Sequence, residues 1–178
     1  GAGYTNDHPV ELMYRDNRLN PIHEGTTGIQ SLDLLGRKVP QNGMAGYQRC
    51  LEGISADLQK AEGIPALVTM CDALDLAVKD LQRTTTSLLS AMTSQDIDLV
   101  MANSVRYLEL FGHVVVGWMW LRQGMTAAKA LEKASDDDAF YKGKLQAMNY
   151  FARWELPQTA VWADLLCGLD DTTYAMQA

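Results

Sequence analysis

One short segment combines the residue types that could do chemistry, and it lies near the start of the chain. It reads His23-Glu24-Gly25-Thr26-Thr27-Gly28, and its spacing predicts the beginning of a helix. The first turn of a helix leaves backbone N–H groups without partners and points the positive end of the helix dipole outward, so such a terminus favours anions. A carboxylate at Glu24 is held there in a defined direction. The alternative is a helix whose first turn happens to hold an acid and a threonine cap, and spacing alone leaves both interpretations open.

The remaining histidines and carboxylates do not predict a metal site. Glu109 and His113 are four residues apart and share one helical face. A di-iron bundle uses two Glu-x-x-His pairs and two further glutamates, and this is one pair at a different spacing. His23-Glu24 is not the start of His-Glu-x-x-His, because position 27 is threonine. We therefore expect no metal.

Charge and hydropathy exclude several other classes of function. The chain has 178 residues, with 15 Lys and Arg against 22 Asp and Glu, and a net charge of −7. A basic face for nucleic acid or anionic lipid is not expected. The longest mostly apolar run, residues 110–121, is well short of the roughly 20 residues that a membrane span needs. No signal peptide opens the sequence, and the missing initiator Met suggests that it begins inside a longer protein.

The cysteines favour a reducing compartment. Cys50, Cys71 and Cys167 are an odd number, none forms a Cys-x-x-Cys pair, and each lies among apolar residues. We expect buried, reduced thiols in a cytoplasmic protein. A disulfide or a reactive thiol is the alternative.

The elements that must position residues 23–28 are predicted to be helices throughout, because apolar residues recur every three or four positions and no alternating β-branched runs occur. Helices are expected over 9–15, 25–38, 42–63 (with Asn42 as a cap and Gly63 at the end), from Pro65 through Leu88, from about 96 to 121, and from 135 onward, where Pro157 either kinks or restarts the helix. The expected buried positions are Ile29, Leu32, Leu35, Met44, Tyr47, Leu51, Ile54, Leu58, Leu67, Met70, Leu74, Val78, Leu81, Leu88, Ile97, Met101, Val105, Leu108, Val115, Met119, Leu121, Leu145, Met148, Phe151, Trp154, Val161, Leu165, Leu166 and Leu169.

These elements predict an all-α chain, most simply an antiparallel helical bundle. Gly112, Gly117 and Gly124 either bend the long helix or allow close packing. Composition changes near Pro40 to Gly43, from a segment dense in Gly, Thr, Asn, Arg and His to a plain bundle pattern. We place a boundary there, with residues 1–40 and 41–178 as separate units, and expect any chemistry in the first.

The first unit resembles the C-terminal end of the acyl-CoA dehydrogenases. The resemblance lies in Gly1-Ala2-Gly3-Tyr4, which is similar to the end of a glycine-rich loop of that family, and in the Glu24-Gly-Thr-Thr-Gly-Ile-Gln30 motif that follows about 20 residues later. From about Met44 to Ala178 the chain is similar, more weakly, to the extra helical domain of one branch of the family, which includes enzymes for long-chain and sulfur-containing acyl thioesters.

The resemblance implies a mechanism. Glu24 is expected to be the base that removes the α-proton of an acyl-CoA while a hydride leaves the β-carbon for the flavin. Gly25 lets the substrate approach the backbone. Thr26, Thr27 and Gly28 are expected to contact FAD near its phosphates, and Gly1 the FAD of a neighbouring subunit.

The chain departs from the family pattern at His23 and at Gly36. His23 stands where many relatives have Tyr, and either tunes Glu24 or packs in the substrate pocket. Gly36 stands where many relatives place an Arg that meets coenzyme A, and we do not transfer that role to Arg37. Trp118, Trp120, Trp154 and Trp162 could line an acyl pocket, but core or subunit-interface packing is favoured.

The resemblance further implies a homodimer or homotetramer that passes electrons to an electron-transferring flavoprotein. The flavin-ring domain and the N-terminal helical domain of the family are absent from these 178 residues, so we expect the chain by itself to bind FAD weakly or not at all and to be inactive. The alternative for residues 41–178 is a non-enzymatic helical assembly or oligomerisation module.

Overall fold

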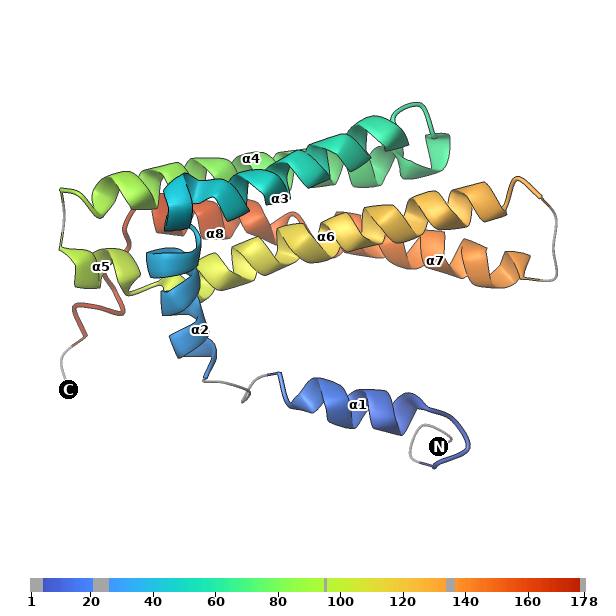
Figure 1. Cartoon of the computed structure of the whole chain (residues 1–178), viewed down its shortest axis with the longest axis horizontal. Helices are drawn as coiled ribbons and strands as arrows, with labels where there is room; N and C mark the ends of the chain where they lie inside the picture. Colours follow the sequence, from blue (N-terminus) through green and yellow to red (C-terminus); the bar gives the residue numbers. More distant parts are fainter. Residues whose placement is uncertain (1–4, 21–25, 95, 134–136, 177–178) are drawn as a thin grey trace.

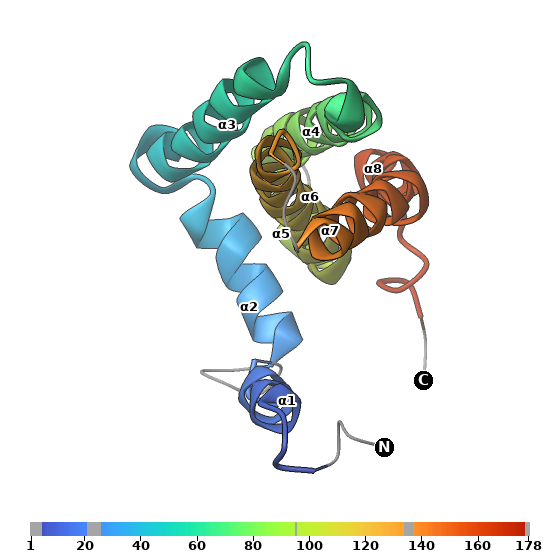
Figure 2. The ribbon, with the colours of Figure 1, turned by 90° about the vertical axis from the view of Figure 1, so that its right-hand side faces the viewer.

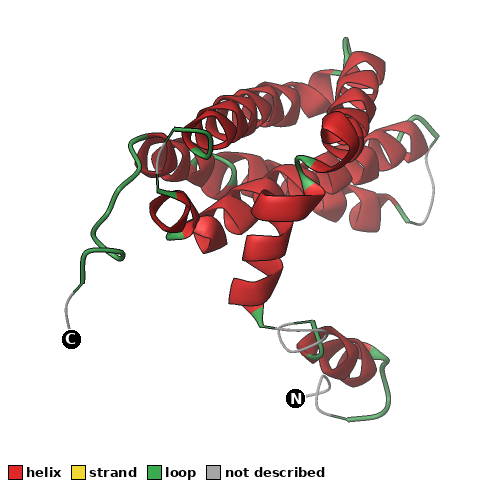
Figure 3. Cartoon of the chain, turned by 60° about the vertical axis from the view of Figure 1, so that its left-hand side comes forward, coloured by secondary structure: helices red, strands yellow, loops and turns green. Residues whose placement is uncertain are grey.

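The computed structural model describes residues 5–20, 26–94, 96–133 and 137–176, and every regular element within those ranges is helical (Figures 1 and 3). The α-helices are α1 (Val10–Arg18), α2 (Thr27–Asp33), α3 (Gln41–Ala61), α4 (Val68–Ala91), α5 (Ile97–Met101), α6 (Ser104–Ala130), α7 (Asp138–Tyr150) and α8 (Gln158–Cys167). Two π-helical turns, η2 (Leu34–Lys38) and η4 (Phe151–Glu155), and a 3₁₀ turn, η3 (Pro65–Leu67), connect some of them.

The core is an antiparallel bundle in which α3, α4 and α6 alternate in direction and α7, η4 and α8 together form the fourth rod (Figures 1 and 2). α6 lies at the centre and touches α2, α3, α4, α7 and α8. The all-α prediction is therefore confirmed for the described residues.

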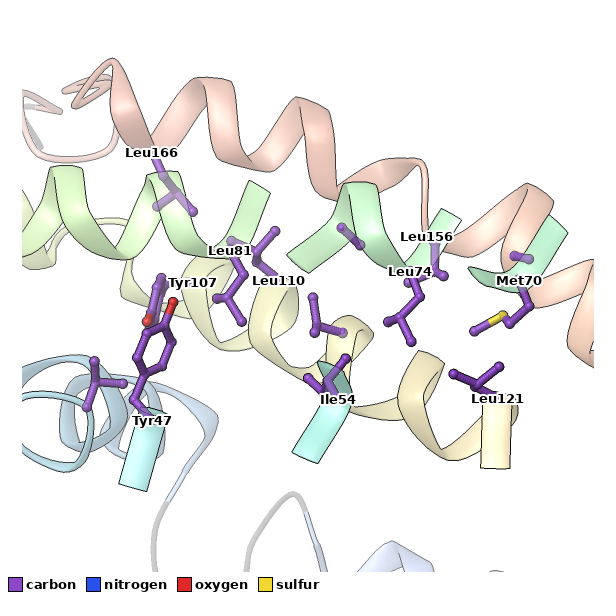
Figure 4. Packing of buried hydrophobic residues seen from close by; sticks show 14 of the residues in the cluster. Tyr47, Ile54, Met70, Leu74, Leu81, Tyr107, Leu110, Leu121, Leu156 and Leu166 are labelled. Atoms are coloured by element: carbon purple, nitrogen blue, oxygen red, sulfur yellow. The ribbon is translucent and has the colours of Figure 1, made fainter. Parts of the chain in front are cut away.

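The buried residues of two helices repeat as in a coiled coil. Buried positions on η3 and α4 recur at spacings of three and four residues, as do those on α6, which is the pattern of helices that pack knobs into holes. These positions are Leu67, Met70, Leu74, Ala77, Leu81, Thr84 and Leu88 on the first rod and Tyr107, Leu110, Val114, Gly117, Leu121 and Gly124 on the second. Figure 4 shows Leu74, Leu110 and Leu121 within one continuous cluster.

Two glycines of α6 let neighbouring helices approach closely. A methyl group at Gly117 would stand 3.1 Å from Leu156 Cδ2 and 3.3 Å from Leu74 Cδ1. At Gly124 it would overlap Met148 Sδ and lie 2.9 Å from Leu67 Cδ2. α6 continues unbroken through both positions, so close packing is the correct alternative for them.

The predicted helix over 96–121 is wrong in its continuity and in most of its buried face. The chain turns at Ala102 and Asn103, where Asn103 Nδ2 donates a hydrogen bond of 2.7 Å to the Asp170 carbonyl. Ile97 is 59% exposed and Val105 37% exposed. Met101, Leu108, Val115 and Met119 are only half-buried, and Leu121 alone of that set is fully buried. The true face was missed because it is built partly from small and hydroxylated residues rather than from the largest apolar ones.

Helix α3 begins differently from the prediction and ends as predicted. Asn42 does not cap it: Asn42, Gly43 and Met44 have φ of 51°, 64° and 66°, so the first turn is kinked in the left-handed region. Gly63, with φ of 80°, follows the last residues of the helix, as the sequence predicts.

The last rod is buried less than predicted. Met148 and Leu166 are buried, but Trp154, Val161 and Leu165 are 67%, 61% and 48% exposed. The π-helical turn η4 shifts the phase of the rod by inserting a wider turn before Pro157. Apolar residues placed at a constant helical period across this turn, such as Trp154 and Val161, therefore face away from the core.

A carboxylate ties α3 to α6. Asp57, whose side chain is 11% exposed, accepts hydrogen bonds from Lys60 Nζ at 2.7 Å and from Trp118 Nε1 at 2.8 Å, and lies 3.5 Å from Arg122 Nε. The Lys60 hydrogen bond, followed by that of Trp118, holds the pKa of Asp57 below its usual range.

Among the described residues, no helix has both the length and the apolar character required to cross a bilayer.

We predict that Gly124→Ala destabilises the chain by about 1–3 kcal/mol, because the new methyl group must displace Met148 and Leu67 in a filled core. Gly112→Ala is the matched control on the same helix. A methyl group there meets no described residue within 4 Å, so the helix propensity of Ala should stabilise the chain by up to about 1 kcal/mol. Urea unfolding followed by circular dichroism measures both, and equal effects would contradict the packing role of Gly124.

We predict that Asp57→Asn lowers the free energy of unfolding by about 1–3 kcal/mol at neutral pH, because two hydrogen bonds lose their charged acceptor. The pKa of Asp57 is lower in the folded chain than in the unfolded chain, so its contribution is full above about pH 4 and disappears as pH falls through the folded pKa. The difference in unfolding free energy between wild type and Asp57→Asn should therefore shrink as pH falls below about 4. Asp75→Asn, which removes an exposed partner of Lys79, should change stability little at any pH.

Candidate functional site

The predicted anion site is the N-terminus of α2. Thr26 precedes the helix in an extended conformation (φ −76°, ψ 165°), and its side chain makes no capping hydrogen bond. The helical bonding begins with Gln30 N, which donates to the Thr26 carbonyl at 3.0 Å. The amides of the residues between them have no acceptor within the helix, as at any α-helix start. No acid stands in the first turn of α2, so none of its own side chains opposes an incoming anion there.

A buried serine pair seats α2 on the bundle. Ser31 is fully buried, and its Oγ donates to the Gly28 carbonyl at 2.7 Å. The same oxygen lies 3.0 Å from Ser104 Oγ at the beginning of α6. Leu35 and Val39, further along, are 0% and 2% exposed. α2 therefore leans against α6 while its N-terminal end extends away from the bundle (Figures 1 and 2).

The buried face of α2 differs from the predicted one. Leu35 is buried as predicted, but Ile29 is 57% and Leu32 47% exposed. Because Ser31 is small, α2 can press its polar side against α6, which turns the two larger apolar residues outward. A rule that buries the largest side chains cannot find this face.

Helix α1 buries none of its residues and stands apart from the bundle in the figures (Figure 3). Leu12 is 50%, Met13 64% and Tyr14 67% exposed. α1 also runs to Arg18, three residues beyond the predicted end. Together with Ile29 and Leu32, it presents an apolar surface that the described residues do not cover.

The structure brings three of the predicted site residues together at this end of α2. Thr26 and Thr27 are exposed and Gly28 is half-buried. Glu24 and Gly25, predicted as base and substrate contact, lie outside the described residues, as do Gly1 and His23. Their predicted roles remain predictions.

Arg37 is engaged within its own helix. Its Nε and Nη2 atoms contact the two carboxylate oxygens of Asp33 at 2.5 and 2.9 Å, and Lys38 Nζ lies 3.3 Å from the same group. The hydrogen bond from Arg37 is the largest influence that lowers the pKa of Asp33. The guanidinium is exposed, but its fork is already occupied by a carboxylate.

The Glu109 and His113 pair takes part in packing. His113 Nδ1 lies 3.0 Å from the Glu109 carbonyl oxygen, and its ring stacks on Phe151 and meets the edge of Trp162. The Glu109 carboxylate pairs with Arg106. Within the ranges that the structure covers, no three His, Cys, Asp or Glu side chains gather as metal ligands would.

The cysteines and tryptophans also occupy structural positions. All three cysteines are free and half-buried, and burial raises the pKa of Cys50 and Cys71, which keeps both thiols protonated. The tryptophans do not share a pocket: Trp118 binds Asp57, whereas Trp154 is largely exposed.

Two features were missed by the sequence analysis. One is the Asp57 contact between α3 and α6, which was visible only as a carboxylate at a core spacing between Ile54 and Ala61. The other is a cleft between α6 and α7 that contains Arg122 and Lys144. These cations come from segments more than 20 residues apart, and no local spacing connects them.

Comparisons with known proteins agree on one family. The family model described as "Acyl-CoA dehydrogenase, C-terminal domain" matches residues 1–39, and the one described as "Acetyl-CoA dehydrogenase C-terminal like" matches residues 50–177. A broad-specificity linear acyl-CoA dehydrogenase of Mycobacterium tuberculosis is 28% identical over 96% of this chain and 29% of its own length. The 3-methylmercaptopropionyl-CoA dehydrogenase of Ruegeria pomeroyi is 34% identical over 86% of this chain and 26% of its own length.

A third relative resembles only part of the chain. The short/branched chain specific acyl-CoA dehydrogenase of Rattus norvegicus is 53% identical over 30 residues, 17% of this chain and 7% of its own. The chain spans less than a third of the length of each of these relatives. The chain has a helical fold, and two models of C-terminal domains of the family match it, one after the other. It therefore belongs to the acyl-CoA dehydrogenase family and corresponds to C-terminal domains of that family.

Proposed function

We propose that the whole protein is an FAD-dependent acyl-CoA dehydrogenase in which this chain supplies the base, Glu24, and part of the flavin site. The observation that carries the proposal is the outward N-terminus of α2. It offers backbone donors and Thr26, and it follows two residues after Glu24. The motif and the family membership give this terminus its chemical context.

The residues at this terminus fit the phosphates of FAD. The Thr26 hydroxyl makes no capping hydrogen bond to α2, and α2 has no acid in its first turn. At Gly28, a methyl group would meet Thr26 Oγ1 at 3.9 Å and no other atom within 4 Å among the described residues, so those residues leave the backbone open to a ligand on that side. Thr26, Thr27 and Gly28 would hold the phosphates through N–H and hydroxyl donors. FAD, when bound, supplies the acceptor for the hydride that leaves the β-carbon of the substrate.

Glu24 removes the proton from the α-carbon, and its carboxylate becomes a carboxylic acid. The backbone N–H of Glu24 donates to the thioester carbonyl, which stabilises the negative charge that develops on that oxygen. Gly25 leaves room for the substrate beside the backbone.

The rest of the protein is needed for this activity. Ile29, Leu32 and α1 expose apolar surface that other parts of the protein would cover, in the same subunit or in a partner. We propose a homodimer or homotetramer in which Gly1 contacts the flavin of a neighbouring subunit, with an electron-transferring flavoprotein as electron acceptor and the cytoplasm as compartment. The 178-residue chain by itself is then inactive.

A second role for residues 41–178 is assembly. Tyr150, Trp154, Val161 and Leu165 are all about half or more exposed and lie at spacings of four and seven on one rod. Tyr150 and Trp154 stack with ring centroids 6.1 Å apart. Such a stripe is typical of a helix that packs against another surface.

We predict that Glu24→Gln in the full-length protein abolishes flavin bleaching by an acyl-CoA, with the rate of reduction falling by about 10²–10⁴-fold, because the amide cannot accept the α-proton. Flavin content and acyl-CoA binding should persist. Stopped-flow absorbance of the flavin measures the rate. Glu62→Gln, an exposed glutamate at the far end of α3, is the control and should leave the rate unchanged. A Glu24→Gln enzyme that still bleaches within a few-fold of the wild-type rate would remove Glu24 from its role.

We also predict that Thr26→Ala weakens FAD retention several-fold, because it removes a hydroxyl donor beside the phosphates while the backbone donors remain. Dialysis followed by measurement of bound flavin tests this. Thr93→Ala, an exposed threonine at the end of α4, should retain wild-type flavin content.

A further inference from the structure

A cleft between α6 and α7 has the size and lining of a small-molecule site. Its volume is about 600 Å³, within the range of roughly 300–1,000 Å³ that such sites occupy. The lining is mostly apolar in area and comes from Met119, Arg122, Gln123, Thr126 and Ala127 on α6 and Phe140, Tyr141 and Lys144 on α7.

The cleft carries positive charge in a chain whose net charge is −7. Arg122 and Lys144 line it, and no carboxylate does among the residues that the structure describes. The groove between α3 and α4 shows the contrast, since Glu52 and Asp75 line it and none of its described lining residues is a cation. The sign of the cleft is therefore a local property of α6 and α7.

The two cations are not equally available. Arg122 lies 3.5 Å from Asp57, which offsets part of its charge, and its guanidinium rests 5.8 Å from the Trp118 ring. Lys144 Nζ lies 5.4 Å from the centroid of the Phe140 ring and 5.8 Å from that of Trp120. No ion pair of Lys144 occurs among the described residues. The aromatic faces hold this ammonium near the cleft without neutralising it.

An exposed aromatic ring supplies the apolar side of the site. Phe140 is 60% exposed, although its edge-to-face contact with Tyr141 fixes it beside the cleft, with ring centroids 5.4 Å apart. Met119 and Ala127 extend the apolar surface along α6. A ligand that covers this surface and also places an anion at Lys144 satisfies both features.

We propose that this cleft binds a straight-chain aliphatic carboxylate, with the carboxylate at Lys144 and Arg122 and the chain along Phe140 and Met119. The carboxylate matches an ammonium that has no ion pair among the described residues, and the aliphatic chain removes the exposed Phe140 ring and the half-buried Met119 side chain from water. This site goes beyond the proposed dehydrogenation and does not depend on it. Arg122 lies 18 residues along α6 from the Ser104 seat of α2, which is about 27 Å at 1.5 Å per residue.

Decanoate is the probe, and the 178-residue chain is the protein. Titration calorimetry should show saturable binding at one site, below the concentration at which decanoate aggregates. In nuclear magnetic resonance spectra, the shifted amides should fall in residues 119–127 and 140–144. Lys144→Met keeps most of the length of the side chain but removes its charge, and should weaken decanoate binding at least fivefold. It should leave the affinity for 1-decanol, which has the same chain without charge, within twofold.

Lys142→Met is the matched control, because Lys142 lies on the same helix, is exposed, and faces Asp138 at 3.8 Å. It should keep decanoate affinity within twofold. Thr126→Phe, at an exposed position on the wall of the cleft, should block both probes. Circular dichroism tests whether each variant is folded. If Thr126→Phe is not folded, the comparison of the two lysine variants decides the question. Absence of saturable binding by wild type, or equal losses in the two lysine variants, would overturn the proposal.

Discussion

The close approach of α6 to its neighbours is the constraint on which the rest of the structure depends. Gly117 and Gly124 present no side chain at two core positions seven residues apart, and Leu156, Leu74, Met148 and Leu67 fill the space that results. α6 can therefore lie at the centre of the bundle, in contact with five other helices. Without those two gaps, α4 and α7 would have to move outward together, because filled interiors do not absorb extra volume locally. The glycines cost helix propensity of about 1 kcal/mol each, and the packing around them offsets that cost.

The same helix sets the direction of α2. Ser104, at the beginning of α6, meets Ser31, and the short side chains allow the two helices to touch along a polar strip. Leu35 and Val39 then bury the other end of the segment. The backbone amides at the N-terminus of α2 can bind a ligand only if the helix is held at a fixed angle to the bundle. The Ser31–Ser104 hydrogen bond and the burial of Leu35 and Val39 fix that angle. The bundle thus acts as the base from which residues 26–28 project.

The sequence predicted what depends on period and on strong local signals, and failed where small or polar residues carry the packing. The end of α3 at Gly63 was predicted correctly, and so were the leucines and Met70 of the run from Leu67 to Leu88, since large apolar residues and a left-handed glycine are local features. Val78 of that run is only half-buried. The faces of α2 and α6 were not, because Ser31, Ser104, Gly117 and Gly124 have no hydrophobic signature. Of the candidate site, the N-terminus of α2 could be predicted, but its angle could not, since that depends on a contact 73 residues away.

Electrostatics unites the two regions of this chain that suit anions. The net charge of −7 repels anions at long range, so an anion is retained only where a local positive potential exceeds that background. At α2 the potential comes from backbone dipoles and needs no basic side chain, which is consistent with the engagement of Arg37 by Asp33. Between α6 and α7 the positive potential comes from the side chains of Arg122 and Lys144. Asp57 offsets part of the charge of Arg122, whereas Lys144 lies over the Trp120 ring.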